Sequence, residues 1–179
     1  KKFAVFAKVE IGEFQGQAIG LAGQGTDAWI AAQYGLQETG LVEGGMAVRV
    51  EAERWLLVSE QPLDIGLPVG QESLWWGLDI KAGIPHLEAV HQGEYIPQML
   101  NLQALDGISF TKGCYMGQEI VARAKYRGAN NRALFVLAGQ ASGHVASGDT
   151  LEIQLGDNWR RSGMVLNAWQ QDGQLWLTA

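Results

Sequence analysis

The sequence predicts an α+β protein in two parts: a mixed helix and strand region over residues 1–128, and a small antiparallel β-barrel over residues 129–179. Before Gly128, short apolar runs alternate with segments that carry helix caps and stops. After Gly128 the pattern changes to alternating apolar and polar residues divided by glycine turns. The chain has 179 residues, 47% of them hydrophobic, which suffices for one large core or two smaller ones.

The first elements form a strand-to-helix unit. Residues 17–23 are a short apolar run that predicts a strand. Thr26 and Asp27 are of the residue types that cap helices, so we expect a helix over residues 28–34. Gly35 then supplies a helix stop, because glycine adopts the left-handed conformation that ends many helices.

A hairpin, a linker and a second helix follow. Residues 46–50 and 54–59 are rich in β-branched and aromatic side chains and flank a polar turn, which predicts a hairpin. Residues 61–71 contain two prolines and two glycines without periodicity, so they are expected to be a loop or a junction between lobes. Ser73 is expected to cap a helix over residues 74–81, with Gly83 and Pro85 beyond its end.

The last helix is expected over residues 117–126, with Gly128 as its stop. It follows a mixed stretch in which Pro97 blocks regular structure. Four strands should follow this helix, over residues 132–138, 150–155, 164–168 and 174–178. Glycine turns, among them Asp172-Gly173, are expected to join these strands.

Composition excludes several classes of protein. No window approaches the roughly 18 consecutive apolar residues that a membrane span requires, and residues 1–9 lack the pattern of a signal peptide. We therefore expect a cytoplasmic protein without a membrane partner. One cysteine forms no internal disulfide and cannot by itself build a zinc or iron–sulfur site, so we expect no metal. The opening residues 1–6 are neither capped nor preceded by a turn, which indicates a missing N-terminal part.

The charge of the chain is negative overall and positive in one place. A net charge of −6 argues against a protein that grips nucleic acid over its whole surface. Five of the thirteen Lys and Arg residues nevertheless lie between Lys112 and Arg132, opposed there by Glu119. Four of them form what we call the basic cluster: Arg123, Lys125, Arg127 and Arg132. This cluster is either a solvated helix face or a binding site for a polyanion.

The most informative segment surrounds the single cysteine. It is named here the cysteine motif and consists of Lys112, Gly113, Cys114, Tyr115, Met116, Gly117, Gln118 and Glu119. Backbone amides near a helix start and a neighbouring lysine favour the thiolate, so Cys114 is a candidate nucleophile or redox-sensitive thiol. The alternative is a small buried hydrophobe, which is what most lone cysteines are. The three histidines have no spacing that places one beside Cys114 and are expected to be surface or hydrogen-bonded residues.

The cysteine motif resembles the KGCYxGQE signature of the YgfZ family, which is related to the glycine-cleavage aminomethyltransferase. The resemblance continues through Ile120 to Asn130 and extends to residues 96–98, 101–105 and 159–163. It implies an aminomethyltransferase-like folate-binding domain before the β-barrel, with both domains incomplete in this chain. It also implies that tetrahydrofolate is bound and that the protein supports iron–sulfur enzymes, including those that thiomethylate transfer RNA.

The resemblance implies site residues on the second predicted helix. Trp75 matches the position at which the family places a tryptophan against the folate, and a flat indole suits a flat pterin ring. Trp76 is expected to lie in the core. Lys81 stands where relatives usually carry a glutamate, and a lysine has no acceptor for a pterin amine. Folate would then bind more weakly or through Asp79 or another acceptor, or Lys81 points to solvent without a role.

Three functions follow as alternatives. The first is a folate-binding accessory factor with iron–sulfur proteins or assembly factors as partners, with or without a thiol-dependent role of Cys114. The second is a folate-dependent aminomethyltransferase, which would need an acid at position 81. The third is a transfer-RNA-binding module, which only the basic cluster supports. The sequence indicates no classical enzyme and leaves catalysis open.

Overall fold

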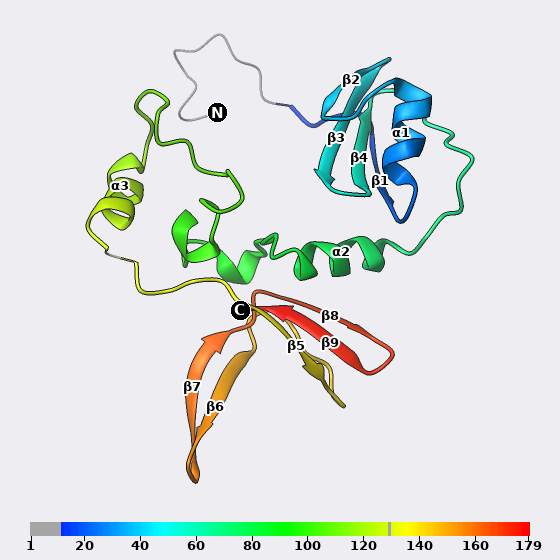
Figure 1. Cartoon of the computed structure of the whole chain (residues 1–179). Helices are drawn as coiled ribbons and strands as arrows, with labels where there is room; N and C mark the ends of the chain where they lie inside the picture. The colour runs from blue at the N-terminus through cyan, green and yellow to red at the C-terminus, as the bar shows by residue number, and fades with distance from the viewer. Residues whose placement is uncertain (1–11, 129) are drawn as a thin grey trace. The chain divides into compact units, whose positions relative to one another are not determined.

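The structure is a computed structural model that describes residues 12–128 and 130–179. It divides into two compact units, Lys1–Val69 and Gly70–Ala179 (Figure 1). Within the described residues no helix has both the length and the apolar character needed to cross a membrane. The expectation about the uncapped start at residues 1–6 lies outside the described residues.

The first unit is a four-stranded antiparallel sheet with one helix. The strands have the spatial order β1-β4-β3-β2. Their bounds, with that of the helix, are β1 (Gln17–Ala22), α1 (Thr26–Tyr34), β2 (Gly40–Val42), β3 (Gly45–Glu51) and β4 (Arg54–Ser59). Helix α1 packs on the sheet, where Ile30 is fully buried against Trp55 and Leu57 of β4. The predicted hairpin is confirmed as β3 and β4, whereas the short strand β2 was not predicted.

The predicted capping of α1 is wrong, although its stop is confirmed. The helix begins at Thr26, its N-cap is Gly25, and neither expected residue caps it through a side chain. The Thr26 hydroxyl donates to the carbonyl oxygen of Gly23 instead, and the Asp27 carboxylate binds groups of the hairpin. Gly35 ends the helix in the left-handed conformation, at φ 69°, as glycine permits.

The second unit begins with helical segments. Their bounds are α2 (Glu72–Lys81), η1 (Ala89–His91), η2 (Pro97–Leu100) and α3 (Gln118–Tyr126). Both long helices lie where the sequence predicts them. The Ser73 cap is wrong, because the N-cap is Gln71 and the Ser73 hydroxyl binds the Gln71 side chain. Gly83, at φ 70°, turns the chain after α2.

Five antiparallel strands follow in two small sheets. Their bounds are β5 (Val136–Gln140), β6 (Thr150–Leu155), β7 (Asn158–Met164), β8 (Asn167–Gln171) and β9 (Gln174–Thr178). One sheet has the order β5-β9-β8, and the other is the hairpin β6-β7. Leu100, Leu134 and Leu166 form a buried cluster that joins η2 to the segments flanking these sheets.

The strand predictions in this region are partly wrong. Residues 150–155 and 174–178 are strands as predicted, whereas the first strand begins four residues later than expected. The residues predicted as one strand over 164–168 are divided between the end of β7 and the start of β8, because the chain changes sheet there. The Val165 amide bonds to the Asp149 carbonyl, while the Leu166 amide bonds to the Thr178 carbonyl. Both side chains are buried, so an apolar core crossing resembles a strand in the sequence.

The boundary between the two compact units falls after Val69, at the end of the segment expected to be a possible junction between lobes. The boundary drawn from the sequence at 128/129, before the β-barrel, stays a prediction. Helix α2 belongs to the second unit because it contacts β8 and β9. The second unit therefore contains both the cysteine motif and the residues expected to hold folate.

Candidate functional site

Helix α2 carries the residues that the resemblance assigns to folate. Asp79 is buried, Trp75 is half-buried, and Lys81 is exposed as a whole residue. The helix lies against β8 and β9 of the second unit (Figure 1). Three tight contacts hold it there, and each involves a residue of β8.

The first contact is a close approach of the α2 backbone to Trp169. A Cβ atom built on Gly77 would lie 2.6 Å from two carbons of the Trp169 ring, a distance that real Cβ atoms do not adopt. Only glycine therefore permits this approach. The sequence placed Gly77 inside a helix, where glycine lowers helix propensity by about 1 kcal/mol relative to alanine. Packing against an indole explains why it is present.

The second contact is a cation–π pairing. The Lys81 ammonium lies 4.7 Å from the ring centroid of Trp169 and 5.2 Å from that of Trp176. Both distances lie within the roughly 6 Å over which such pairs attract. Lys81 therefore does not simply point to solvent, which was one of the alternatives for it.

The third contact fixes the turn after α2. The Asn167 side chain accepts from the His86 amide at 3.0 Å and donates to the His86 carbonyl at 2.9 Å. The His86 ring in turn lies 2.7 Å from the Asp79 carboxylate, Nε2 to Oδ2. The Asp79 carboxylate is thus already bonded to His86. A pterin amine bound to Asp79 would have to share that carboxylate with the histidine.

The two tryptophans of α2 have different surroundings. Trp75 is half-buried. Trp76 is 42% exposed, so the expectation that it lies in the core is wrong. Its indole N–H donates to Glu72, and its ring packs edge-on against His86 with centroids 4.6 Å apart. Part of the Trp76 indole surface is therefore exposed on α2, whereas the Asp79 carboxylate is bonded to His86.

The cysteine motif forms an exposed turn into α3. Cys114 is exposed, so the alternative of a buried hydrophobe is excluded for this cysteine. The Tyr115 amide donates to the Gln118 side chain, and the Lys112 ammonium lies 4.6 Å from the Tyr115 ring centroid. Gly117 is the N-cap of α3 at φ 87°, a conformation that favours glycine. The turn thus holds the thiol on the surface, four residues before the helix.

Helix α3 is anchored by a buried glutamine. The Gln98 side chain donates to the Val121 carbonyl at 2.6 Å, which ties η2 to α3. Asn130 donates in turn to the Gln98 carbonyl at 3.2 Å. Because Gln98 is buried, this anchor fixes the face of α3 that carries Val121 and Ala124 and leaves the other face exposed.

Two residues of the basic cluster, Arg123 and Lys125, lie at exposed positions of α3, and their charges are engaged by neighbouring side chains. Arg123 forms an i,i+4 ion pair with Glu119 at 2.8 Å, and the Lys125 ammonium lies 3.5 Å from the Phe110 ring centroid. Arg127 and Arg132 are exposed. The cluster is therefore a modest positive surface. A shallow hollow on this face is lined by Glu119, Ala122, Arg123, Tyr126 and Arg127.

Among the described residues, two shallow hollows can be compared with the candidate sites, and neither joins them. One is the hollow on α3. The other lies in the first unit and is lined mainly by Phe14, Leu41, Met46 and Val58. Neither lining includes Trp75 or Cys114.

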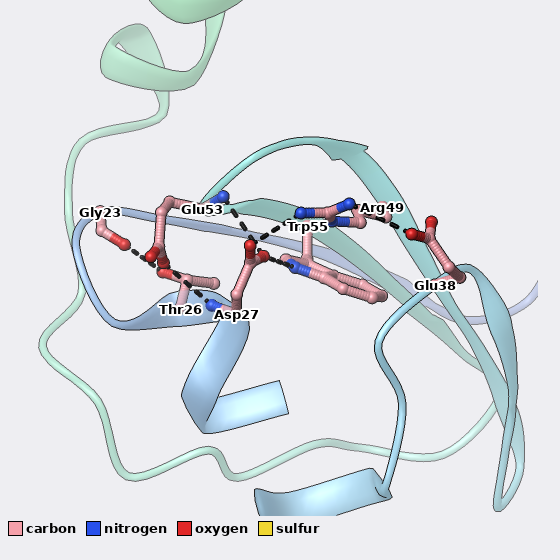
Figure 2. A network of polar contacts seen from close by, with 7 residues as sticks. All are labelled: Gly23, Thr26, Asp27, Glu38, Arg49, Glu53 and Trp55. Atoms are coloured by element: carbon pink, nitrogen blue, oxygen red, sulfur yellow. Dashed lines mark hydrogen bonds and ion pairs between the residues drawn. The ribbon is translucent and has the colours of Figure 1, made fainter. Parts of the chain in front are cut away.

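A polar network in the first unit was not predicted. The Asp27 carboxylate accepts from the Trp55 indole at 2.6 Å, the Arg49 guanidinium at 2.9 Å and the Glu53 amide at 3.2 Å (Figure 2). The Asp27 amide donates back to the Glu53 carboxylate at 3.0 Å. The network joins the first turn of α1 to the β3–β4 hairpin. Because Asp27 and Glu53 each bond the backbone amide of the other, the network indicates a structural role.

No metal centre is formed in the part of the chain that the structure describes, since no three His, Cys, Asp or Glu side chains there are arranged to hold an ion.

Comparison with known families matches residues 130–179 to the YgfZ β-barrel domain. These residues are similar to that domain. The match supports a YgfZ-family protein, which is the family that the cysteine motif resembles. The matched YgfZ domain includes Asn167, Trp169 and Trp176, so all three contacts that hold α2 are made with it.

Several residues of this site were missed in the sequence. The signal for Trp169 and Trp176 was present, because the Asp172-Gly173 turn places them opposite each other in the β8–β9 register. No spacing rule points to Asn167, which is 81 residues from His86. The Asp79–His86 pair spans the Gly83 turn and follows neither helix nor strand periodicity.

Proposed function

We propose that this chain belongs to a cytoplasmic tetrahydrofolate-binding accessory protein that supports iron–sulfur enzymes and, through them, thiomethylation of transfer RNA. An aminomethyltransferase-like folate-binding domain would precede the barrel. The observation that carries the proposal is the exposed cysteine motif in the same compact unit as a YgfZ β-barrel domain. An exposed thiol at a helix entry can react with, or be covered by, a partner protein.

Trp75 supports the folate part of the proposal. It is a half-buried indole on a helix that is rigidly held, and stacking on such a ring contributes about 1 kcal/mol beyond the burial of area. The indole would orient the pterin or aminobenzoyl ring, and Asp79 would have to share its bond with His86 to hold an amine. We assign no reaction on the folate to this chain.

The aminomethyltransferase alternative is less well supported. It needs an acid at position 81, where the chain has a lysine whose ammonium lies over two tryptophans. The transfer-RNA alternative rests on the basic cluster, in which Arg123 is paired with Glu119 and the whole chain is acidic. Neither gains a specific supporting contact.

Folate binding is tested by isothermal titration calorimetry of the full-length protein with tetrahydrofolate under anaerobic conditions. Trp75→Leu should weaken binding about fivefold, which corresponds to the loss of roughly 1 kcal/mol of stacking. Trp159→Leu is the control, because Trp159 is 62% exposed and lies on β7. The absence of binding heat at millimolar folate would reject the proposal that the protein binds folate. Equal effects of Trp75→Leu and Trp159→Leu would reject the role given to Trp75.

The role of the thiol is tested in cells that lack their own YgfZ-family protein. Cys114→Ala should fail to restore the activity of iron–sulfur enzymes while leaving folate affinity and the melting temperature unchanged. Met116→Ala, which alters an exposed neighbour, should restore that activity. Full restoration by Cys114→Ala would show that the thiol is dispensable.

A further inference from the structure

Two tryptophans of the YgfZ β-barrel domain form a cation site that the chain fills with its own lysine. Trp169 and Trp176 are directly opposite in the β8–β9 register, so their side chains share one face of the sheet. The Lys81 ammonium lies over both rings, at 4.7 and 5.2 Å from their centroids. These two residues are named here the tryptophan pair.

The same face of α2 is fitted to this pair over a full turn. Gly77 and Lys81 are four residues apart and therefore lie on one side of the helix. Gly77 gives Trp169 room to approach the backbone, and Lys81 then covers the pair from the helix end. Translation or rotation of α2 would break both contacts at once.

The turn after α2 is fixed to the same strand. Asn167 lies two residues before Trp169, so both side chains are on one face of β8. Its two hydrogen bonds to the His86 backbone prevent the end of α2 from swinging away. Lys81 thus sits between two anchors, Gly77 before it and His86 after it.

We propose that Lys81 is a positioning residue, a latch that holds α2 on the tryptophan pair and thereby fixes the orientation of Trp75 toward its ligand. The part that concerns the ligand rests on the proposed function. On this view position 81 does not contact folate. The tryptophan pair of the barrel domain thereby influences the affinity for folate at Trp75. It does so through Lys81 and α2, without contacting the ligand itself.

The first test separates a latch from a direct ion pair. Calorimetry compares tetrahydrofolate with the primary amide of tetrahydropteroate, which lacks the glutamate and carries no carboxylate. Lys81→Met keeps the aliphatic stem and removes the charge, so it should weaken binding of both ligands about two- to fivefold. Lys81→Arg should restore binding, because a guanidinium also pairs with indole faces.

Two results would overturn the latch in this experiment. If Lys81 binds the glutamate of folate, Lys81→Met should weaken only the complex with tetrahydrofolate, and the difference should shrink at high salt. If Lys81→Met leaves both affinities unchanged, position 81 does not orient the site.

The second test needs no folate. Lys81→Met should lower the melting temperature by about 2 to 4 °C, and this effect should shrink in a Trp169→Leu background, because the nearer of the two partner rings is then absent. In a Trp159→Leu background the effect should persist. Equal effects of Lys81→Met in all three backgrounds would overturn the latch. If the unmodified protein does not bind folate, the proposed function is rejected and the latch is not. The dependence of the Lys81→Met effect on Trp169 would then still test whether Lys81 holds α2 on the tryptophan pair.

Discussion

At the scale of single residues, Asp27 shows how one carboxylate connects two elements. Three donors converge on it, from an indole, a guanidinium and a backbone amide (Figure 2). The hydrogen bond from Trp55, followed by that from Arg49, lowers the pKa of Asp27 below its ordinary value. The same carboxylate raises the pKa of Arg49. The first turn of α1 is therefore held to the hairpin by an ionised side chain.

The stability contributed by Asp27 should depend on pH. Because its pKa in the folded protein is lower than the value near 4 of an unfolded chain, the contribution is complete above about pH 4 and is lost as the pH falls further. Asp27→Asn should lower the melting temperature at pH 7, and the difference from the unmodified protein should narrow near pH 2. Thermal unfolding followed by circular dichroism at both pH values measures this.

Glu38→Gln is the matched control for Asp27. Glu38 also contacts Arg49, at 3.3 Å, but its side chain is 80% exposed, so its pairing is well screened by solvent. We expect little change at either pH. A pH-independent difference between Asp27→Asn and the unmodified protein would contradict the proposed ionic contribution.

At the scale of elements, the packing of α2 on β8 decides how its residues are used. Apolar and aromatic residues occur on several sides of this helix, so periodicity alone did not show which side would be buried. The side chosen is the one with the least bulk, since Gly77 admits the Trp169 ring. Because the Gly77 side of α2 faces β8, Trp76 lies on another side of the helix and is exposed.

Gly77→Ala should therefore destabilise the protein although alanine is the better helix former. The gain in helix propensity is about 1 kcal/mol, whereas overpacking against a rigid ring costs about 1 to 3 kcal/mol, so a net loss is expected. Chemical denaturation followed by tryptophan fluorescence measures the free energy of unfolding.

Gly70→Ala serves as the control for this substitution. A Cβ at Gly70 would meet Leu74 at 3.7 Å, which is an ordinary contact, so stability should be nearly unchanged. A stabilising Gly77→Ala would show that α2 can move away from Trp169, and the close approach would then not constrain the helix.

At the scale of the whole molecule, the chain consists of two compact units joined through residues 60–71. This segment has no helix or strand, and Val69 in it is 98% exposed. Protease sites require locally extended, accessible backbone. A low-specificity protease should therefore cut first between residues 60 and 71.

Mass spectrometry of the early fragments checks this expectation. The fragments should end or begin inside residues 60–71, and the segment of α2 should stay intact in the larger one because the barrel domain packs on it. A first cut within α2 or between β8 and β9 would contradict the division into these units.

The sequence by itself determined the local elements and the family resemblance. Gly35, Gly83 and Gly117 mark helix ends because glycine alone adopts positive φ without strain, and the structure has them at these places. The β3–β4 hairpin and the last strand follow from side chains that suit a pleated surface. The cysteine motif pointed to the family whose barrel domain matches residues 130–179.

Only the tertiary structure decided what these residues contact. The apolar run at Val165 and Leu166 reads as a strand, yet it is a buried crossing between two sheets, because hydrophobicity records burial and not hydrogen-bond partners. The roles of Asp79 and Lys81 were likewise undetermined, since their partners His86, Trp169 and Trp176 come from outside the helix. Contacts between distant segments depend on how elements pack, and local periodicity does not encode that.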